Sequence, residues 1–139
     1  MSNQDNTITK QIADIGRKYK LDFIILHGSK VTGKTINPES DTDIAVYRKG
    51  GIDFKEELSL IGEFAHIYGD NVDVKTLHKK NSLFLYEAMR DSVLLYGNED
   101  LYKEFFLTAY KKYHDSKDLF DNLIIMNQKN IDQLKSDYA

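Results

Sequence analysis

The spacing of apolar residues changes several times along the chain, and each change predicts a different element. Apolar residues recur every three or four positions over residues 9–19 and 54–68, which predicts two amphipathic helices. Residues 22–27 form a nearly all-apolar run, the pattern of a strand buried on both faces. Residues 41–47 and 71–77 are typical of two further strands. The predicted order is therefore helix, strand, loop, strand, helix, strand.

The last third of the chain is predicted to be largely helical. Residues 82–90 have helical spacing, and residues 93–96 form a short apolar segment that a glycine ends. From Glu99 onward, helix-forming residues continue almost to the end, and we expect a break near residues 115–116. Residues 119–125 hold more apolar side chains than one packed face needs, so we expect part of this segment to contact another chain.

These elements predict one α/β domain over residues 1–139, with a core at about 9–97 and a helical C-terminal segment at about 99–135. The core is expected to be a small mixed sheet with flanking helices on one face. Composition agrees, because 41% hydrophobic and 29% charged residues are typical of a globular protein. Cysteine is absent, which excludes disulfides, Cys-ligated zinc and a cysteine nucleophile.

Charge and hydropathy argue against two further classes of protein. The net charge of −3, with both signs mixed along the chain, gives no reason to expect direct binding to nucleic acid. No apolar run approaches the roughly 18 residues of a membrane span. The N-terminus is polar and lacks the hydrophobic stretch of a signal peptide. We therefore expect a cytoplasmic protein.

The candidate chemistry lies at the ends of the predicted strands: Gly28 and Ser29 follow the first, Asp41 and Asp43 open the second, and Asp73 lies in the third. Strand residues two apart share a face, so the carboxylates of Asp41 and Asp43 lie side by side. Asp73 can join them from a neighbouring strand. Three carboxylates repel each other unless a cation lies among them, and Mg²⁺ prefers such ligands together with substrate phosphates. The glycine and serine supply donors for a triphosphate. This is the arrangement of a nucleotide-transfer site.

Three different structures with similar motifs fit the sequence less well. Ser40 and Asp43 match a loose capping box, but the residues that follow are too β-like for a helix. An EF-hand loop fails because Ala45 stands where a third oxygen ligand is needed. Residues 28–35 match the Walker A pattern letter for letter. In a P-loop, however, the Lys-Thr pair opens a long helix, which Pro38 would end after about one turn.

Residues 26–33, followed by residues 40–46, resemble the G-S…D-x-D signature of the DNA polymerase β-type nucleotidyltransferase superfamily. The pattern is most similar to the minimal nucleotidyltransferase (MNT) antitoxins, which are encoded beside HEPN-domain RNase toxins. The resemblance covers residues 21–97 well and the C-terminal helices loosely. It implies a polymerase β-like core that transfers AMP from ATP to a tyrosine of the partner toxin.

The resemblance also implies a role for each motif residue. Gly28 and Ser29 would hold the triphosphate, and Asp41 and Asp43 would bind magnesium. Asp73 would complete the metal site and act as the base toward the acceptor hydroxyl. Eleven residues separate Ser29 from Asp41, one more than is common in these antitoxins. A loop absorbs such an insertion easily, although it can shift how Ser29 meets the phosphates.

The remaining polar residues near the motifs are given lesser roles. His27, beside the Gly-Ser pair, is expected to pack at the end of its strand rather than take part in chemistry. His66, His78 and His114 lack partners at metal-ligand spacing. A set of lysines near the motifs is expected to be solvated: Lys30, Lys34, Lys75, Lys79 and Lys80.

The sequence leaves two alternative functions open. One is a small-molecule nucleotidyltransferase of the antibiotic-modifying kind, although such enzymes normally carry an extra acceptor-binding domain. The second is a non-catalytic antitoxin that sequesters its partner by contact, although Asp41, Asp43 and Asp73 are all present.

Overall fold

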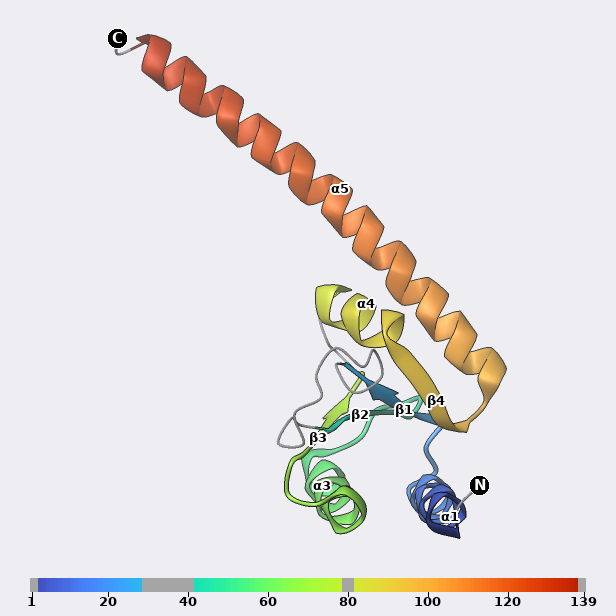
Figure 1. The fold of residues 1–139 in the computed structure, drawn as a ribbon. Helices are drawn as coiled ribbons and strands as arrows, with labels where there is room; N and C mark the ends of the chain where they lie inside the picture. Colours follow the sequence, from blue (N-terminus) through green and yellow to red (C-terminus); the bar gives the residue numbers. More distant parts are fainter. Residues whose placement is uncertain (1–2, 29–41, 79–81, 138–139) are drawn as a thin grey trace.

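The computed structural model describes residues 3–28, 42–78 and 82–137 (Figure 1). The predicted helices and strands are confirmed, and the short apolar segment 93–96 lies in a fourth strand. The elements in chain order are α1 (Asn3–Lys18), β1 (Phe23–His27), β2 (Thr42–Tyr47), α3 (Phe54–Tyr68), β3 (Val72–Thr76), α4 (Ser82–Arg90), β4 (Ser92–Gly97) and α5 (Glu99–Asp137).

The described strands form a four-stranded mixed sheet in the order β3-β2-β1-β4, which confirms the predicted sheet type. Strand β1 is antiparallel to both of its neighbours, while β2 and β3 are parallel. The apolar strand β1 is therefore central, and β3 lies at one edge. Because β2 and β3 run in the same direction, the chain must cross over between them, and α3 makes that crossover.

Both faces of the sheet are covered, so the prediction of helices on one face only is wrong. Helices α1 and α3 lie on one face, and α4 and α5 lie on the other (Figure 1). Strand β1 supplies the reason. Ile24 packs with α1 and α3, Phe23 and Ile25 pack toward α4 and α5, and none of the three has exposed surface (0%). Burying each such side chain stabilises the fold by about 1.5–3 kcal/mol, which requires cover on both sides.

A polar cluster joins the start of α3 to the end of β2. Asp53 accepts a hydrogen bond from the Glu56 amide, and the Glu56 carboxylate accepts one from the Asp53 amide, which is a capping box. Arg48, directly after β2, donates two 2.7 Å hydrogen bonds to the same carboxylate. These bonds from Arg48 lower the pKa of Glu56 to about 2. The cluster therefore fixes where the crossover leaves the sheet.

Helix α5 runs for 39 residues without interruption, so the predicted break near residues 115–116 is wrong. The helix contains neither proline nor glycine, and nothing in its sequence forces it to end there. Its first half packs on the sheet, whereas its second half projects away from the rest of the chain (Figure 1). Five apolar side chains on the projecting half are 45–59% exposed: Leu123, Ile124, Ile125, Met126 and Ile131.

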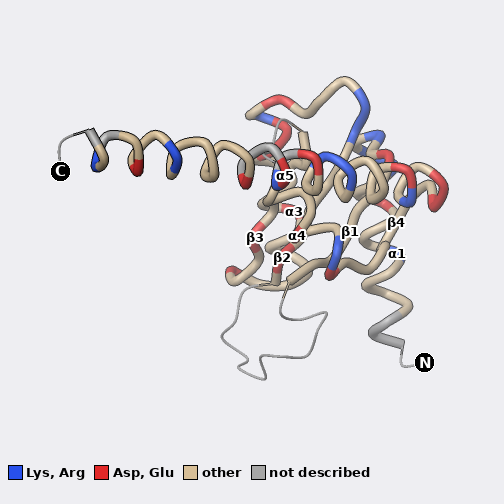
Figure 2. The backbone as a smooth tube through the Cα atoms, turned by 90° about the horizontal axis from the view of Figure 1, so that it is seen from above, with Lys and Arg blue, Asp and Glu red and all other residues tan. Residues whose placement is uncertain are grey.

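Acidic and basic residues are interspersed over the chain, without a block of one sign along α5 (Figure 2). This agrees with the mixed charge pattern of the sequence. Among the described residues, no helix has both the length and the hydropathy needed to cross a membrane.

Candidate active site

The register of the sheet places Asp73, Asp43 and His27 in one row across three adjacent strands. Asp43 on β2 lies directly opposite Asp73 on β3 and directly opposite His27 on β1. Residues paired in register point to the same face of a sheet. That face is the one covered by α4 and α5, because Ile25, two residues before His27 on β1, packs there. Two carboxylates and an imidazole therefore share one side of the sheet, where β1 ends and β2 and β3 begin.

Gly28 brings the main chain close to this row. Its φ of +86° lies in the left-handed region that favours glycine. A Cβ atom at this position would lie only 2.5 Å from Asp43 Oδ2, a distance that side chains do not tolerate. Glycine is thus favoured by the backbone conformation, and any larger residue would also force the Asp43 carboxylate to move. The two remaining predicted site residues, Ser29 and Asp41, lie outside the described residues.

His27 is packed as the sequence predicted. Its side chain is buried, and its ring meets Phe84 of α4 edge-on, with 6.3 Å between ring centroids. Burial lowers the pKa of His27, and Lys75 lowers it further, while the carboxylates of Asp43 and Asp73 act in the opposite direction. The Nε2 atom is buried and has no hydrogen-bond partner within the described part of the chain.

Lys75, which the sequence ranked only as a solvated lysine, contacts one carboxylate of the row. It follows Asp73 by two positions on β3, so both side chains lie on the same face. Its ammonium nitrogen lies 3.4 Å from Asp73 Oδ2 and 5.2 Å from the ring centroid of Phe84. The two-residue spacing is visible in the sequence. Most lysines near a motif are solvated, however, so the spacing alone does not single this one out.

Comparison of the sequence with known protein families identifies the family of this chain. The family model described as polymerase beta, nucleotidyltransferase matches residues 10–101. The chain belongs to the polymerase β nucleotidyltransferase family. The match includes all the site residues that the sequence singled out, and no curated protein sequence matches the chain.

Solved structures share the fold of this nucleotidyltransferase. A crystal structure described as a toxin–antitoxin with AMP-PNP has a TM-score of 0.68 at 21% identity, covering 84% of this chain and 98% of that chain. A Shewanella oneidensis tri-AMPylated HEPN toxin in complex with an MNT antitoxin gives a TM-score of 0.64 at 19% identity, covering 86% and 98%. The fold expected from the resemblance to MNT antitoxins is confirmed.

The described part of the candidate site fits a divalent cation. Asp43 and Asp73 present oxygen ligands from adjacent strands, and the Lys75 ammonium already stands as a cation against one of them. Within the described ranges no group of three His, Asp or Glu side chains is close enough to hold a metal ion by itself. Mg²⁺ needs few protein ligands, because it keeps waters and takes substrate phosphates. Asp43 and Asp73 would hold it here.

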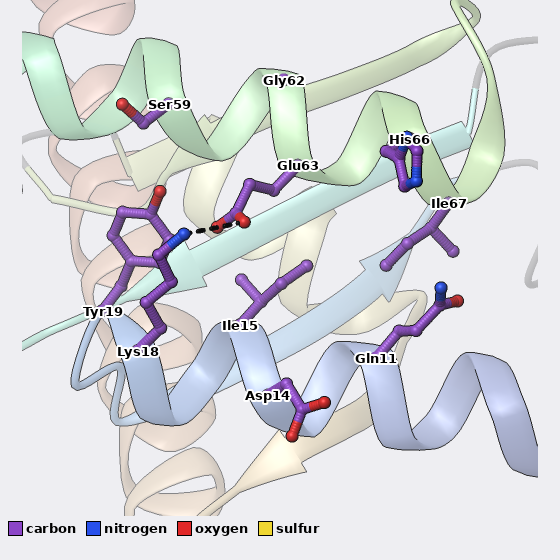
Figure 3. Close-up of a pocket in the computed structure, with 10 residues that line it drawn as sticks. All are labelled: Gln11, Asp14, Ile15, Lys18, Tyr19, Ser59, Gly62, Glu63, His66 and Ile67. Atoms are coloured by element: carbon purple, nitrogen blue, oxygen red, sulfur yellow. Dashed lines mark hydrogen bonds and ion pairs between the residues drawn. The ribbon is translucent and has the colours of Figure 1, made fainter.

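A separate cavity of about 600 Å³ lies between α1 and α3, on the other face of the sheet (Figure 3). Ile15 and Ile67 line it together with polar side chains, and Lys18 spans from α1 to Glu63 on α3 with a 3.1 Å ion pair. Of the predicted site residues that the structure describes, Gly28, Asp43 and Asp73, none lines this cavity. The cavity is therefore separate from the row of Asp73, Asp43 and His27.

Proposed function

We propose that this nucleotidyltransferase transfers AMP from ATP to a tyrosine hydroxyl of a partner HEPN RNase toxin and thereby neutralises it. The observation that carries the proposal is the Asp43–Asp73 pair, which lies in register beside the close approach of Gly28. A shared fold with toxin–antitoxin complexes, one of them containing an AMPylated toxin, supports the choice of partner. The toxin acts on RNA, so both proteins would work in the cytoplasm.

Each residue of the predicted site has a distinct part in the proposed reaction. The Gly28 main chain and Ser29 would hold the triphosphate. Asp41 and Asp43 would bind Mg²⁺, and Asp73 would complete the metal site on the side of the acceptor. The tyrosine oxygen attacks the α-phosphorus of ATP, its proton passes to Asp73, and pyrophosphate leaves as the new phosphodiester bond forms. Bound Mg²⁺ supplies charge stabilisation for the attacking and leaving oxygens. The roles of Ser29 and Asp41 rest on their motif positions.

The direct test is a transfer assay on the purified partner. We expect the reading frame beside this one to encode a small helical protein with an R-x₄₋₆-H-x-Y motif. Incubation of that protein with the nucleotidyltransferase, ATP and Mg²⁺ should add adenylyl groups to the motif tyrosine, as measured by intact-mass and peptide mass spectrometry. EDTA should abolish the addition. A partner that stays unmodified while its RNase activity is blocked would instead favour sequestration by contact.

The projecting half of α5 is expected to bind the partner. Leu123 and Ile124 are 48% and 51% exposed, and apolar surface of this kind marks an interface. The double variant Leu123→Ser/Ile124→Ser should bind the partner at least ten-fold more weakly, because interface anchors of this size contribute about 1–2 kcal/mol each. Pull-down and calorimetry measure the loss.

Circular dichroism is the control for this variant. These residues lie beyond the part of α5 that packs on the sheet, so the melting temperature of the α/β core should change little. Unchanged partner affinity would show that the projecting half of α5 does not form the interface.

A further inference from the structure

The two carboxylates of the row, Asp43 and Asp73, lie side by side even before any metal binds. Asp43 and Asp73 are paired in register on adjacent strands, which lie about 4.8 Å apart. Carboxylates on paired residues of adjacent strands repel each other, and a positive charge beside them offsets the repulsion. A cationic side chain beside the pair would make this arrangement more favourable without Mg²⁺.

Lys75 is a cationic side chain in this position. Its Nζ atom lies 3.4 Å from Asp73 Oδ2, and both side chains are a little under half exposed, at 44% and 43%. Lys75 and Asp73 lie two positions apart on β3, so the strand directs both side chains to the same face of the sheet. The ring of Phe84, 5.2 Å from Nζ, gives the ammonium a second favourable contact. The same ring packs against His27, which keeps it at the row.

We propose that Lys75 is the internal counter-ion of Asp73 in the Asp43–Asp73 pair. In the absence of metal, its ammonium neutralises Asp73, and a divalent cation binds by displacing it. The displaced ammonium stays against the Phe84 ring, within reach of the site. This inference rests on the proposed function, because it takes the carboxylate pair as the metal site. Lys75 then lowers the affinity of the carboxylate pair for a metal ion that arrives without a nucleotide.

The charges of the row set the size of the effect. A lysine ammonium near the site repels an incoming divalent cation even in a water-like dielectric. Partial exposure of the ion pair screens this repulsion and keeps its effect modest. Removal of the ammonium should therefore tighten the binding of Mg²⁺ alone by about five-fold.

The test is Mg²⁺ binding without nucleotide, measured by calorimetry and by the rise in melting temperature with MgCl₂. Lys75→Met should bind Mg²⁺ about five-fold more tightly than the wild type. Its melting temperature should be lower without Mg²⁺, because the carboxylates lose their counter-ion, and should approach that of the wild type at saturating Mg²⁺. Lys75→Arg keeps the charge and should behave like the wild type.

Lys18→Met is the matched control. It removes one lysine from a comparable ion pair, with Glu63 on the other face of the sheet, and should leave Mg²⁺ affinity unchanged (Figure 3). Equal or weaker binding of Mg²⁺ by Lys75→Met, while the wild type binds it, would overturn the counter-ion role and leave the proposed function standing. Failure of the wild type to bind Mg²⁺ at all, with or without ATP, would overturn the proposed function and this inference together.

Discussion

Asp43→Asn is expected to lose both Mg-ATP affinity and nucleotidyl transfer. Asp43 lies at the centre of the row, opposite Asp73 on one side and His27 on the other, with the Gly28 main chain against its carboxylate. The amide keeps the size of the side chain but removes the negative charge that a metal ligand needs. Loss of a residue that merely supports a metal ligand costs roughly 10–100-fold, so loss of the ligand itself should lower transfer at least ~100-fold.

Calorimetry of ATP binding gives the measurement for Asp43→Asn. The wild type should bind ATP much more tightly with Mg²⁺ than in EDTA, whereas the variant should bind weakly under both conditions. Asp14→Asn is a control of the same chemistry, because Asp14 lies on α1, on the other face of the sheet, and is exposed beside Arg17. Equal Mg-ATP affinity in Asp43→Asn and the wild type would remove Asp43 from the metal site.

The fold could be predicted where the signal is local. The apolar run of β1 and the helical spacing of α3 each reflect one element's own burial, so their types and positions followed from the sequence. The arrangement of helices did not follow, because it depends on which segment packs on each face of β1. The break predicted in α5 was wrong for a similar reason. Polar residues within a helix do not by themselves end it, and no proline or glycine interrupts α5.

The candidate site, too, could be predicted only where the signal is local. The two-residue spacing of Asp41 and Asp43, and the place of Asp73 on another strand, are visible in the sequence. The row itself is tertiary, since it depends on the parallel register of β2 with β3 and the antiparallel register of β1 with β2. No local pattern gives that register. The contact of Lys75 with Phe84 depends in addition on where α4 packs. The sequence therefore could not distinguish Lys75 from the other lysines near the motifs.

Asp73→Asn is expected to separate binding from chemistry. Asp73 lies on the edge strand β3, and its side chain is 43% exposed, so an acceptor can approach it from solvent. A tyrosine hydroxyl has a pKa near ~10 and needs a base to attack at neutral pH. A positioned base contributes on the order of 10²–10⁴ in rate. The variant should therefore keep most of its Mg-ATP affinity and lose transfer by at least that factor.

Single-turnover transfer and Mg-ATP affinity, measured side by side for Asp43→Asn and Asp73→Asn, decide whether the roles differ. Asp73→Asn also breaks the ion pair with Lys75, and Lys75→Met shows the effect of that loss alone, because it keeps the carboxylate. If the missing base is the cause, transfer should fall far more in Asp73→Asn than in Lys75→Met. Transfer by Asp73→Asn at the wild-type rate would show that the proton of the acceptor leaves by another route, and the assignment of Asp73 as the base would then be wrong.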